Sequence, residues 1–282
     1  MKKNLKKLVV GMLSVAVFGS VLTGCGATNS AITVVSREDG SGTRSAFTEI
    51  IGVAVDDEDH TVATAEVTNS TSVMMTTIEG NENAIGYISM GSLNDSVKAV
   101  QVDGVEATPE NVKSGDYKVS RPFEICISKD GTTEVAKDFI NYILSDDGQA
   151  VITEEGYISV TSGHTYEAAG MEGKITIAGS TSVAPVMEIL AEEYKELNPN
   201  VVIEIQQTGS SAGIESATQG ACDIGMSSRS LKEEELANLE AIRIAMDGIC
   251  VIVNVNATVS DLTAQQIKDI YVGTITDWSQ VE

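Results

Sequence analysis

Aromatic side chains are scarce in this 282-residue chain, because Phe, Trp and Tyr together make up only 4% of it. The core must therefore be built mainly from Val, Ile, Leu, Ala and Met, the usual filling of sheets covered by helices. The hydrophobic share of 42% is ordinary for a folded protein, and the length leaves room for two modest domains. The composition favours an α/β fold.

Histidine is scarcer still, since His60 and His164 are the only two and both stand in polar, irregular segments. A hydrolase or phosphatase that used Ser41 or Ser182 as its nucleophile would need a base beside it. The chain also has no GxxxxGK[ST] or GxGxxG motif, so nucleotide binding is unsupported. These absences favour a binding protein without a cofactor over an enzyme.

Basic residues are outnumbered, with 18 Lys and Arg against 41 Asp and Glu and a formal net charge of −23. This charge is unsuited to binding nucleic acid or an anionic lipid surface. It would also repel an anionic ligand, although salt screens remote surface charge beyond a Debye length of about 8 Å. An anion site in this chain must depend on local, desolvated hydrogen-bond donors.

The N-terminus has the pattern of an export signal over residues 1–24: four lysines among the first seven residues, then an apolar stretch over 8–22. Removing it takes the net charge to −27, because those lysines are its only charged residues. The stretch ends in Leu22-Thr23-Gly24-Cys25, which resembles the bacterial lipobox and implies lipidation of Cys25. An ordinary secretory signal with an incidental cysteine is the alternative. Residues 25–30 would form a tether to the outer face of the cytoplasmic membrane.

Cys126, Cys222 and Cys250 each stand in an apolar, strand-like run. No CxxC pair and no Cys/His metal spacing occurs. We expect buried free thiols and no metal, with one disulfide among the three as the alternative in an exported protein.

Strands alternate with helices along the chain. Residues 31–36 and the run KITIA from Lys174 read as strands, and each leads through a Gly-rich turn into a helix. Residues 161–173 are small and polar and predict a surface linker. Strands separated by helices favour a parallel sheet with ligands at the carboxyl ends of its strands.

Three loops share one design, in which a strand ends, a Gly/Ser/Thr turn follows and a helix starts. They are AGSTS (178–182), TGSSAG (208–213) and DGSGTR (39–44). Helix N-termini present unpaired N–H groups and partial positive charge, so such turns suit an anion. A single loop of this kind is usually only an N-cap, but three together indicate one shared oxyanion.

Charged residues flank these loops. Arg37 can fork onto two oxygens of a tetrahedral anion, and Asp39 can orient it, although an exposed loop salt bridge would look the same. Asp223, in the strand CDIGMSSR, is a second carboxylate beside the predicted site. A carboxylate tolerates an anion only if the ligand donates a proton, so Asp223 would select phosphate over sulfate.

The segments ITIAGSTSVAP, QQTGSSAGI, CDIGMSSR and SREDGSGTRSAF together closely resemble phosphate ABC transporter substrate-binding proteins. The resemblance implies a two-lobed periplasmic-binding-protein-like fold of type II, each lobe a mixed sheet flanked by helices, with the ligand in the cleft between the lobes. It further implies a monomeric, exported lipoprotein that passes inorganic phosphate to the permease. A surface sensor or adhesin of the same fold for another small ligand is the alternative. The implied phosphate contacts are Thr181, Ser182, Ser210, Ser211, Asp223, Arg37, Ser41, Gly42 and Thr43, with Asp39 orienting Arg37.

The order of segments departs from the family pattern, in which the AGSTS segment opens the mature chain. Here residues 31–160 come first and 174–282 second, as in a circular permutant, although a truncated tandem duplication would look similar. Lobe A would then span 119–253, and lobe B would be split into 31–118 and 254–282. The two lobes would be joined near 118–121 and 252–256 and would close on the ligand.

Overall fold

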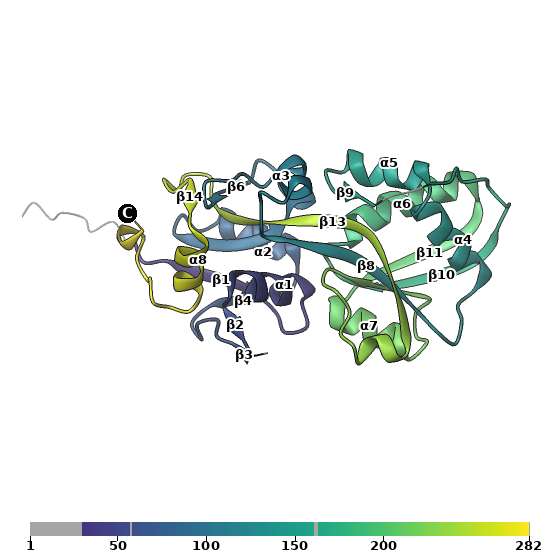
Figure 1. Ribbon diagram of the computed structural model, residues 1–282, viewed down its shortest axis with the longest axis horizontal. Helices are drawn as coiled ribbons and strands as arrows, with labels where there is room; N and C mark the ends of the chain where they lie inside the picture. Colours follow the sequence, from purple (N-terminus) through teal and green to yellow (C-terminus); the bar gives the residue numbers. More distant parts are fainter. Residues whose placement is uncertain (1–29, 57, 161–162, 282) are drawn as a thin grey trace, which may run out of the picture.

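The computed structural model describes residues 30–56, 58–160 and 163–281, so the predicted signal and Cys25 lie outside the described residues. The chain forms two lobes side by side, connected by two long strands (Figure 1). Of the described residues, lobe A comprises 120–160 and 163–248, and lobe B comprises 30–56, 58–119 and 249–281. Each lobe has an apolar core of its own. This is the mixed α/β, two-lobed architecture that the sequence predicted.

In lobe A a mixed sheet runs in the order β11-β10-β12-β8-β13, the short strand β9 also pairs with β13, and helices cover both faces. Helices α4, α5 and α6 pack on one face, and α7 packs on the other, against Cys126 and Ala178. The elements of lobe A are β8 (Ser120–Ser128), α4 (Glu134–Ile143), α5 (Asp146–Glu154), β9 (Ile158–Ser159), β10 (Glu172–Gly179), α6 (Ala184–Leu197), β11 (Asn200–Gln207), α7 (Ser210–Thr218), β12 (Ile224–Ser227), η2 (Glu235–Ala237) and β13 (Leu239–Asn254).

Lobe B continues from β13 through β5 and the parallel strands β1 and β4. Three of its aromatic residues form a cluster, where Phe47 of α1 stacks on Tyr87 of β5 at a centroid distance of 4.0 Å and Tyr271 of α8 packs edge-on. The elements of lobe B are β1 (Thr33–Arg37), α1 (Gly42–Ile51), β2 (Ala54–Val55), β3 (Glu58–Asp59), β4 (Glu66–Thr68), α2 (Thr71–Glu79), β5 (Ala84–Ser89), η1 (Met90–Ser92), β6 (Val97–Ala99), β7 (Gln101–Val102), α3 (Pro109–Ser114), β14 (Asp261–Leu262), α8 (Ala264–Tyr271) and η3 (Trp278–Gln280).

Strands β8 and β13 carry the chain between the lobes. β13 pairs with β8 over Leu239–Gly248 and with β5 over Ile249–Val253, so its partner changes between Gly248 and Ile249. This corrects the predicted crossing at 252–256, because residues 249–253 belong to the core of lobe B. The run GICVIVN is apolar throughout, so the sequence does not indicate the residue at which β13 changes its partner strand.

A buried ion pair ties the two crossing strands together. Arg121 of β8 donates to Asp247 of β13 through Nε and Nη2, both at 3.1 Å, and Asp247 also accepts from the hydroxyl of Ser89 in lobe B. Both charged residues are at most 2% exposed. Burial raises the pKa of Asp247 to about 6, although Arg121 opposes the shift. The pair therefore lies where the lobes would pivot.

The predicted linker 161–173 is only partly a surface segment. Its described residues 163–171 have no regular structure, but Tyr166 is 7% exposed. Its hydroxyl donates to Asp138 at 2.6 Å and accepts from Asn198 at 2.8 Å, which satisfies a buried polar group. The segment is therefore pinned to the core of lobe A.

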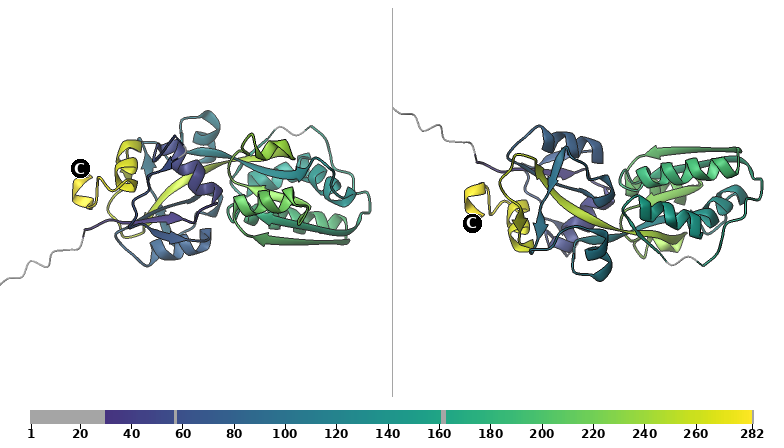
Figure 2. Two further views of the ribbon diagram at one scale, coloured as in Figure 1. Left: turned by 90° about the horizontal axis from the view of Figure 1, so that it is seen from below. Right: turned by 90° about the horizontal axis from the view of Figure 1, so that it is seen from above.

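The views from below and above separate the same two lobes and place the C-terminal segment at the end of lobe B far from lobe A (Figure 2). No helix in the described part of the chain is long and apolar enough to cross a membrane. The cysteines Cys126, Cys222 and Cys250 are buried and free, as predicted.

Candidate functional site

The three hydroxyl-rich loops meet where the lobes face each other. Strand β10 ends at Gly179 and β12 at Ser227 in lobe A, while β1 ends at Arg37 in lobe B. The carboxyl ends of these strands all point at the boundary between the lobes. The loops that follow them therefore approach one another from both sides.

The loop after β10 is shaped by Gly179 and Ser180. Gly179 has a φ of +140°, and a Cβ there would lie 2.3 Å from the carbonyl oxygen of Met226, so only glycine fits. The Ser180 hydroxyl accepts from the backbone N–H groups of Ser182 and Val183 at 3.2 and 3.4 Å. This turn presents Thr181 and Ser182 to lobe B just before α6 begins.

The loop before α7 is fastened to the same turn. The backbone N–H groups of Thr208 and Gly209 both donate to the carbonyl of Gly179 at 2.9 Å. Ser210, the first residue of α7, is fully buried, and its hydroxyl accepts from the backbone N–H of Ser228 at 3.1 Å. The hydroxyls of Ser210 and Ser228 are 3.3 Å apart. Lobe A therefore contributes two pairs of hydroxyl residues.

Ser228 is a residue that the sequence reasoning missed. It follows the last residue of β12, where strand ends and hydroxyl residues coincide in the other loops too. The same rule that selected Thr181 and Ser210 could therefore have found Ser228.

Lobe B supplies hydroxyls from two helix starts. Thr43 in the first turn of α1 lies 2.9 Å from Ser182, measured between hydroxyl oxygens. Thr71, the first residue of α2, lies 3.3 Å from Thr181 and 3.4 Å from Ser182. Thr71 was not among the predicted residues. The four hydroxyls form one chain across the boundary between the lobes.

Gly42 brings the backbone of lobe B against the serine pair of lobe A. A Cβ at Gly42 would lie 2.4 Å from the Ser210 hydroxyl oxygen and 2.7 Å from that of Ser228. The preceding Ser41 caps α1, because its hydroxyl accepts from the N–H of Arg44 at 3.4 Å. Ser41 therefore has the role of a helix cap, while Gly42 makes the close approach.

Arg37 is the cation of the cluster and is only 2% exposed. Its Nη2 donates to the Thr181 hydroxyl at 3.1 Å across the lobe boundary. The guanidinium is held by Glu38, whose two oxygens accept from Nε and Nη2, each at 2.9 Å. On strand β5, the Tyr87 hydroxyl accepts from the Arg37 backbone N–H at 3.2 Å. Burial raises the pKa of Tyr87 to about 12, so it stays neutral.

The predicted role of Asp39 is corrected by this arrangement, because Glu38 and not Asp39 holds Arg37. The Asp39 carboxylate is 98% exposed and accepts from Arg44 Nη1 at 2.7 Å. Arg44 is held in turn by Asp59, also at 2.7 Å. Neighbouring acidic residues in a turn cannot be assigned to one arginine from sequence alone.

The structure does not bring Asp223 to the cluster. It stands at the start of β12, at the opposite end of the strand from Ser228. Its carboxylate accepts from the backbone N–H and hydroxyl of Thr176 at 2.8 and 2.7 Å and from the hydroxyl of Thr133 at 3.3 Å. Asp223 therefore ties α4 to the sheet, and it is removed from the candidate site.

Ser211 joins the lobes through its backbone, since its N–H donates to the carbonyl of Gly40 at 3.0 Å. Its hydroxyl accepts from Arg229 Nη2 at 3.4 Å. Glu235 holds the Arg229 guanidinium at 2.7 and 2.8 Å. Burial alone would raise the pKa of Glu235, but its hydrogen bonds from Arg229 lower it. This ion pair fixes the turn that carries Ser228.

The cluster is buried and rich in donors. Arg37, Thr43, Thr71, Thr181, Ser182, Ser210 and Ser228 are each at most 6% exposed. Helices α1, α2, α6 and α7 all begin beside it, and their N-termini add partial positive charge. The arrangement suits a small anion that accepts hydrogen bonds on several sides.

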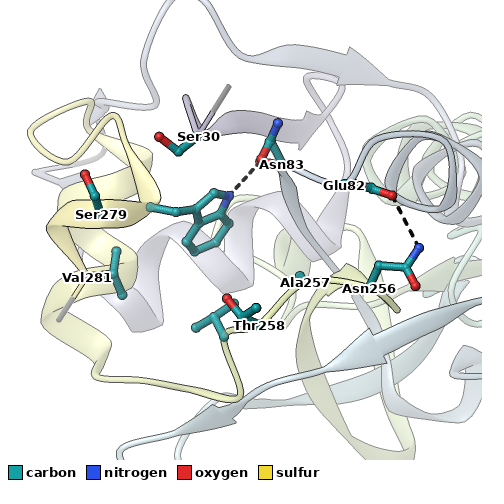
Figure 3. A pocket seen from close by; sticks show the side chains of 10 residues that line it. Ser30, Glu82, Asn83, Asn256, Ala257, Thr258, Ser279 and Val281 are labelled. Atoms are coloured by element: carbon teal, nitrogen blue, oxygen red, sulfur yellow. Dashed lines mark hydrogen bonds between the residues drawn. The ribbon is translucent and has the colours of Figure 1, made fainter. Parts of the chain in front are cut away.

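A separate cavity of about 530 Å³ lies in lobe B beside both described ends of the chain (Figure 3). Trp278 lines it and donates from Nε1 to the carbonyl of Asn83 at 3.1 Å, while Asn256 donates to Glu82 at 3.4 Å. The carboxylate of Glu82 would repel an anion, and none of the predicted site residues lines this cavity. It is not the oxyanion site.

Two lobes that meet through buried donors, and are joined by two crossing strands, define a ligand-binding protein of the two-lobed class. The model of the PBP superfamily domain matches residues 6–147 and 163–282. The phosphate-binding protein PstS 2 of Streptococcus agalactiae is 49% identical over 272 residues, which is 93% of each chain. That of Streptococcus pneumoniae is 41% identical over 290 residues, covering 98% of this chain and 99% of the relative.

A solved structure gives the same result. The crystal structure of a phosphate ABC transporter, phosphate-binding protein from Streptococcus pneumoniae TIGR4 covers 89% of this chain and all of its own, at 43% identity and a TM-score of 0.72. This chain therefore belongs to the PBP superfamily and, within it, to the family of the PstS phosphate-binding proteins.

Proposed function

We propose that this protein captures inorganic phosphate outside the cytoplasm and delivers it to the permease of an ABC importer. One observation carries the proposal: buried hydroxyls of both lobes converge with Arg37, and Thr43 and Ser182 bridge the lobes at 2.9 Å. The names of the full-length relatives support it, because they are phosphate-binding proteins.

Binding would exchange neutral hydrogen bonds for charge-assisted ones. The hydroxyls now bond to one another, as Thr71 does to Thr181 and Ser182. A phosphate oxygen would accept from them instead, and a hydrogen bond to a charged group contributes about 1.5–3 kcal/mol against about 1 kcal/mol for a neutral one. Because the donors come from both lobes, the ligand would hold the lobes together, and the closed form would dock on the permease.

The protein would bind phosphate without cleaving a bond. The two histidines lie outside the cluster: His164 contacts the carbonyl of Asn141, and the backbone N–H of His60 donates to Val53. A hydroxyl nucleophile in the cluster would thus have no imidazole base beside it.

Calorimetric titration tests this function. The chain without residues 1–24 should bind phosphate, and the double variant Thr181→Val/Ser182→Ala should bind about 10- to 100-fold more weakly, because two donors to the anion are lost. Ser216→Ala is the matched control, since this half-buried α7 hydroxyl donates to the carbonyl of Ala212 within its own helix, at 2.7 Å. Equal phosphate binding by the double variant and the control would refute the assignment.

We further propose that Cys25 carries the lipid that anchors the protein to the outer face of the cytoplasmic membrane. The pattern Leu22-Thr23-Gly24-Cys25 supports this proposal. In a bacterial host fed with labelled palmitate, the wild-type chain should take up label and sediment with membranes. The variant Cys25→Ser should do neither, and label on that variant would contradict the proposal.

We also propose that the segments run in rotated order relative to other PstS proteins. The PstS proteins of Pseudomonas aeruginosa and Bacillus subtilis match only 38% and 39% of this chain, at 35% and 33% identity, whereas the PstS 2 relatives match along nearly all of it. If two chains carry the same segments in rotated order, an alignment that follows the sequence from end to end can match only part of each chain. The described ends are also neighbours, since Ser30 donates to Asp277 at 2.8 Å. Adjacent ends are what a permutation requires.

A further inference from the structure

We infer that the site selects its ligand by charge, because no carboxylate that the structure describes is placed to accept a proton from the ligand. The site should therefore bind tetrahedral dianions in general, including sulfate as well as phosphate. The inference rests on the proposed function and names the ligand class of that same site. It follows from which acidic groups stand near the hydroxyl cluster and from what each of them already binds.

Among the described residues, the carboxylate that belongs to the cluster is Glu38. Both of its oxygens accept from Arg37 at 2.9 Å, and its side chain is 26% exposed. Glu38 lies on the side of Arg37 that faces Gly209. A Cβ added at Gly209 would be 3.6 Å from Oε1 of Glu38. Both carboxylate oxygens of Glu38 are therefore already bonded to Arg37, and Glu38 serves to orient the arginine.

The other acidic groups around the site are committed elsewhere. Asp39 is bound to Arg44 and exposed, and Glu235 is bound to Arg229. On the crossing strands, Asp247 accepts from Arg121, Ser89 and the N–H of Met90. Glu124, which lies opposite Ser227 in the sheet, accepts from the backbone N–H of Leu231. None of these hydrogen bonds is to a hydroxyl of the cluster.

Neutral hydroxyls treat a ligand proton differently from a carboxylate. A serine or threonine oxygen can accept the proton of a P–OH group or donate to a bare oxygen, and neither case creates a clash of charges. A carboxylate would penalise a ligand without a proton. In a site lined by hydroxyls, the preference for one anion over another comes from the positive charge of Arg37 and of the helix N-termini. These favour the ligand of higher negative charge.

Ser228 stands at the position where a carboxylate would change this selectivity. It is 1% exposed, its hydroxyl is 3.3 Å from that of Ser210, and the start of α1 from the other lobe presses against both. A carboxylate at this position would stand among the ligand-facing hydroxyls and could accept a proton from phosphate but not from sulfate. The variant Ser228→Asp should therefore create the discrimination that the wild-type site lacks.

Titrations at several pH values test the inference on the chain without residues 1–24. Phosphate affinity should fall at least about tenfold between about pH 8 and pH 5, because the dianion is lost over this range; the second pKa of a phosphoester is about 6, and that of inorganic phosphate is higher. Sulfate stays a dianion throughout and is the internal control. Its affinity should be within about tenfold of that of phosphate at the higher pH and should not change over the range.

Two variants sharpen the test. Ser228→Asp should widen the ratio of phosphate to sulfate affinity by about tenfold or more, a change of about 1.4 kcal/mol. Glu38→Gln should leave the ratio unchanged while weakening both anions, and a change in the ratio would make Glu38 the proton acceptor and overturn the inference.

The outcomes separate the two claims. Tight phosphate binding that does not vary with pH, together with sulfate binding more than about a hundredfold weaker, would overturn the inference and leave phosphate capture intact. Failure to bind phosphate at any pH would overturn both. If Ser228→Asp does not fold, the wild-type comparison of the two anions still decides.

Discussion

Replacing Gly42 by alanine should damage binding without damaging either lobe. The new Cβ would lie 2.4 Å from the Ser210 hydroxyl oxygen and 2.7 Å from that of Ser228, and both of these belong to the other lobe. Such overpacking costs about 1–3 kcal/mol when the neighbours cannot move, which corresponds to about 5- to 150-fold in affinity. Within α1 itself, alanine is the better residue by up to about 1 kcal/mol.

The assay pairs calorimetry with thermal unfolding. Gly42→Ala should bind phosphate at least about fivefold more weakly, while its midpoint of unfolding without phosphate is unchanged or higher. Gly80→Ala at the far end of α2 is the matched control, because the nearest atom to its Cβ would be the Thr76 carbonyl oxygen at 3.4 Å. Phosphate binding by Gly42→Ala at wild-type strength would show that the start of α1 does not press on lobe A in the bound form.

Three further outcomes are expected. Arg37→Lys should weaken phosphate binding about 10- to 100-fold in calorimetry, because an ammonium cannot contact Glu38 and the ligand in the planar fork that a guanidinium offers; unchanged affinity would exclude direct contact. Thr71→Val, which keeps the shape and removes one hydroxyl, should cost about fivefold, and no loss would place Thr71 outside the site. Asp247 has a folded pKa of about 6, above its unfolded value of 3.8, so its contribution to stability grows as pH falls from about 6 towards 4. Urea unfolding should therefore show the free energy of wild type rising relative to Asp247→Asn over that range, and a constant difference would refute the shift.

The sequence predicted those members of the hydroxyl cluster that follow from local rules. Thr181, Ser182 and Ser210 stand after strand ends and before helices, and a helix start can be read from a single segment. Thr71 was missed because the segment around it is polar and irregular in pattern, although nine residues form α2. Its hydroxyl matters only because the fold brings it to within 3.3 Å of Thr181, 110 residues away.

The errors arose where a charge partner depends on tertiary placement. Asp223 and Ser228 are five positions apart on one strand segment, and only the direction of that strand decides which of them faces lobe B. Glu38 and Asp39 are adjacent, and the turn into α1 sends one to Arg37 and the other to Arg44. Sequence patterns identify such acids but do not assign their partners.

A structure of the protein crystallised with phosphate would test the central claim most directly. We predict one phosphate between the lobes, within hydrogen-bond distance of Arg37 and Thr43 from lobe B and of Thr181 and Ser210 from lobe A. Phosphate bound instead in the cavity beside Trp278, or held by one lobe alone, would contradict the account.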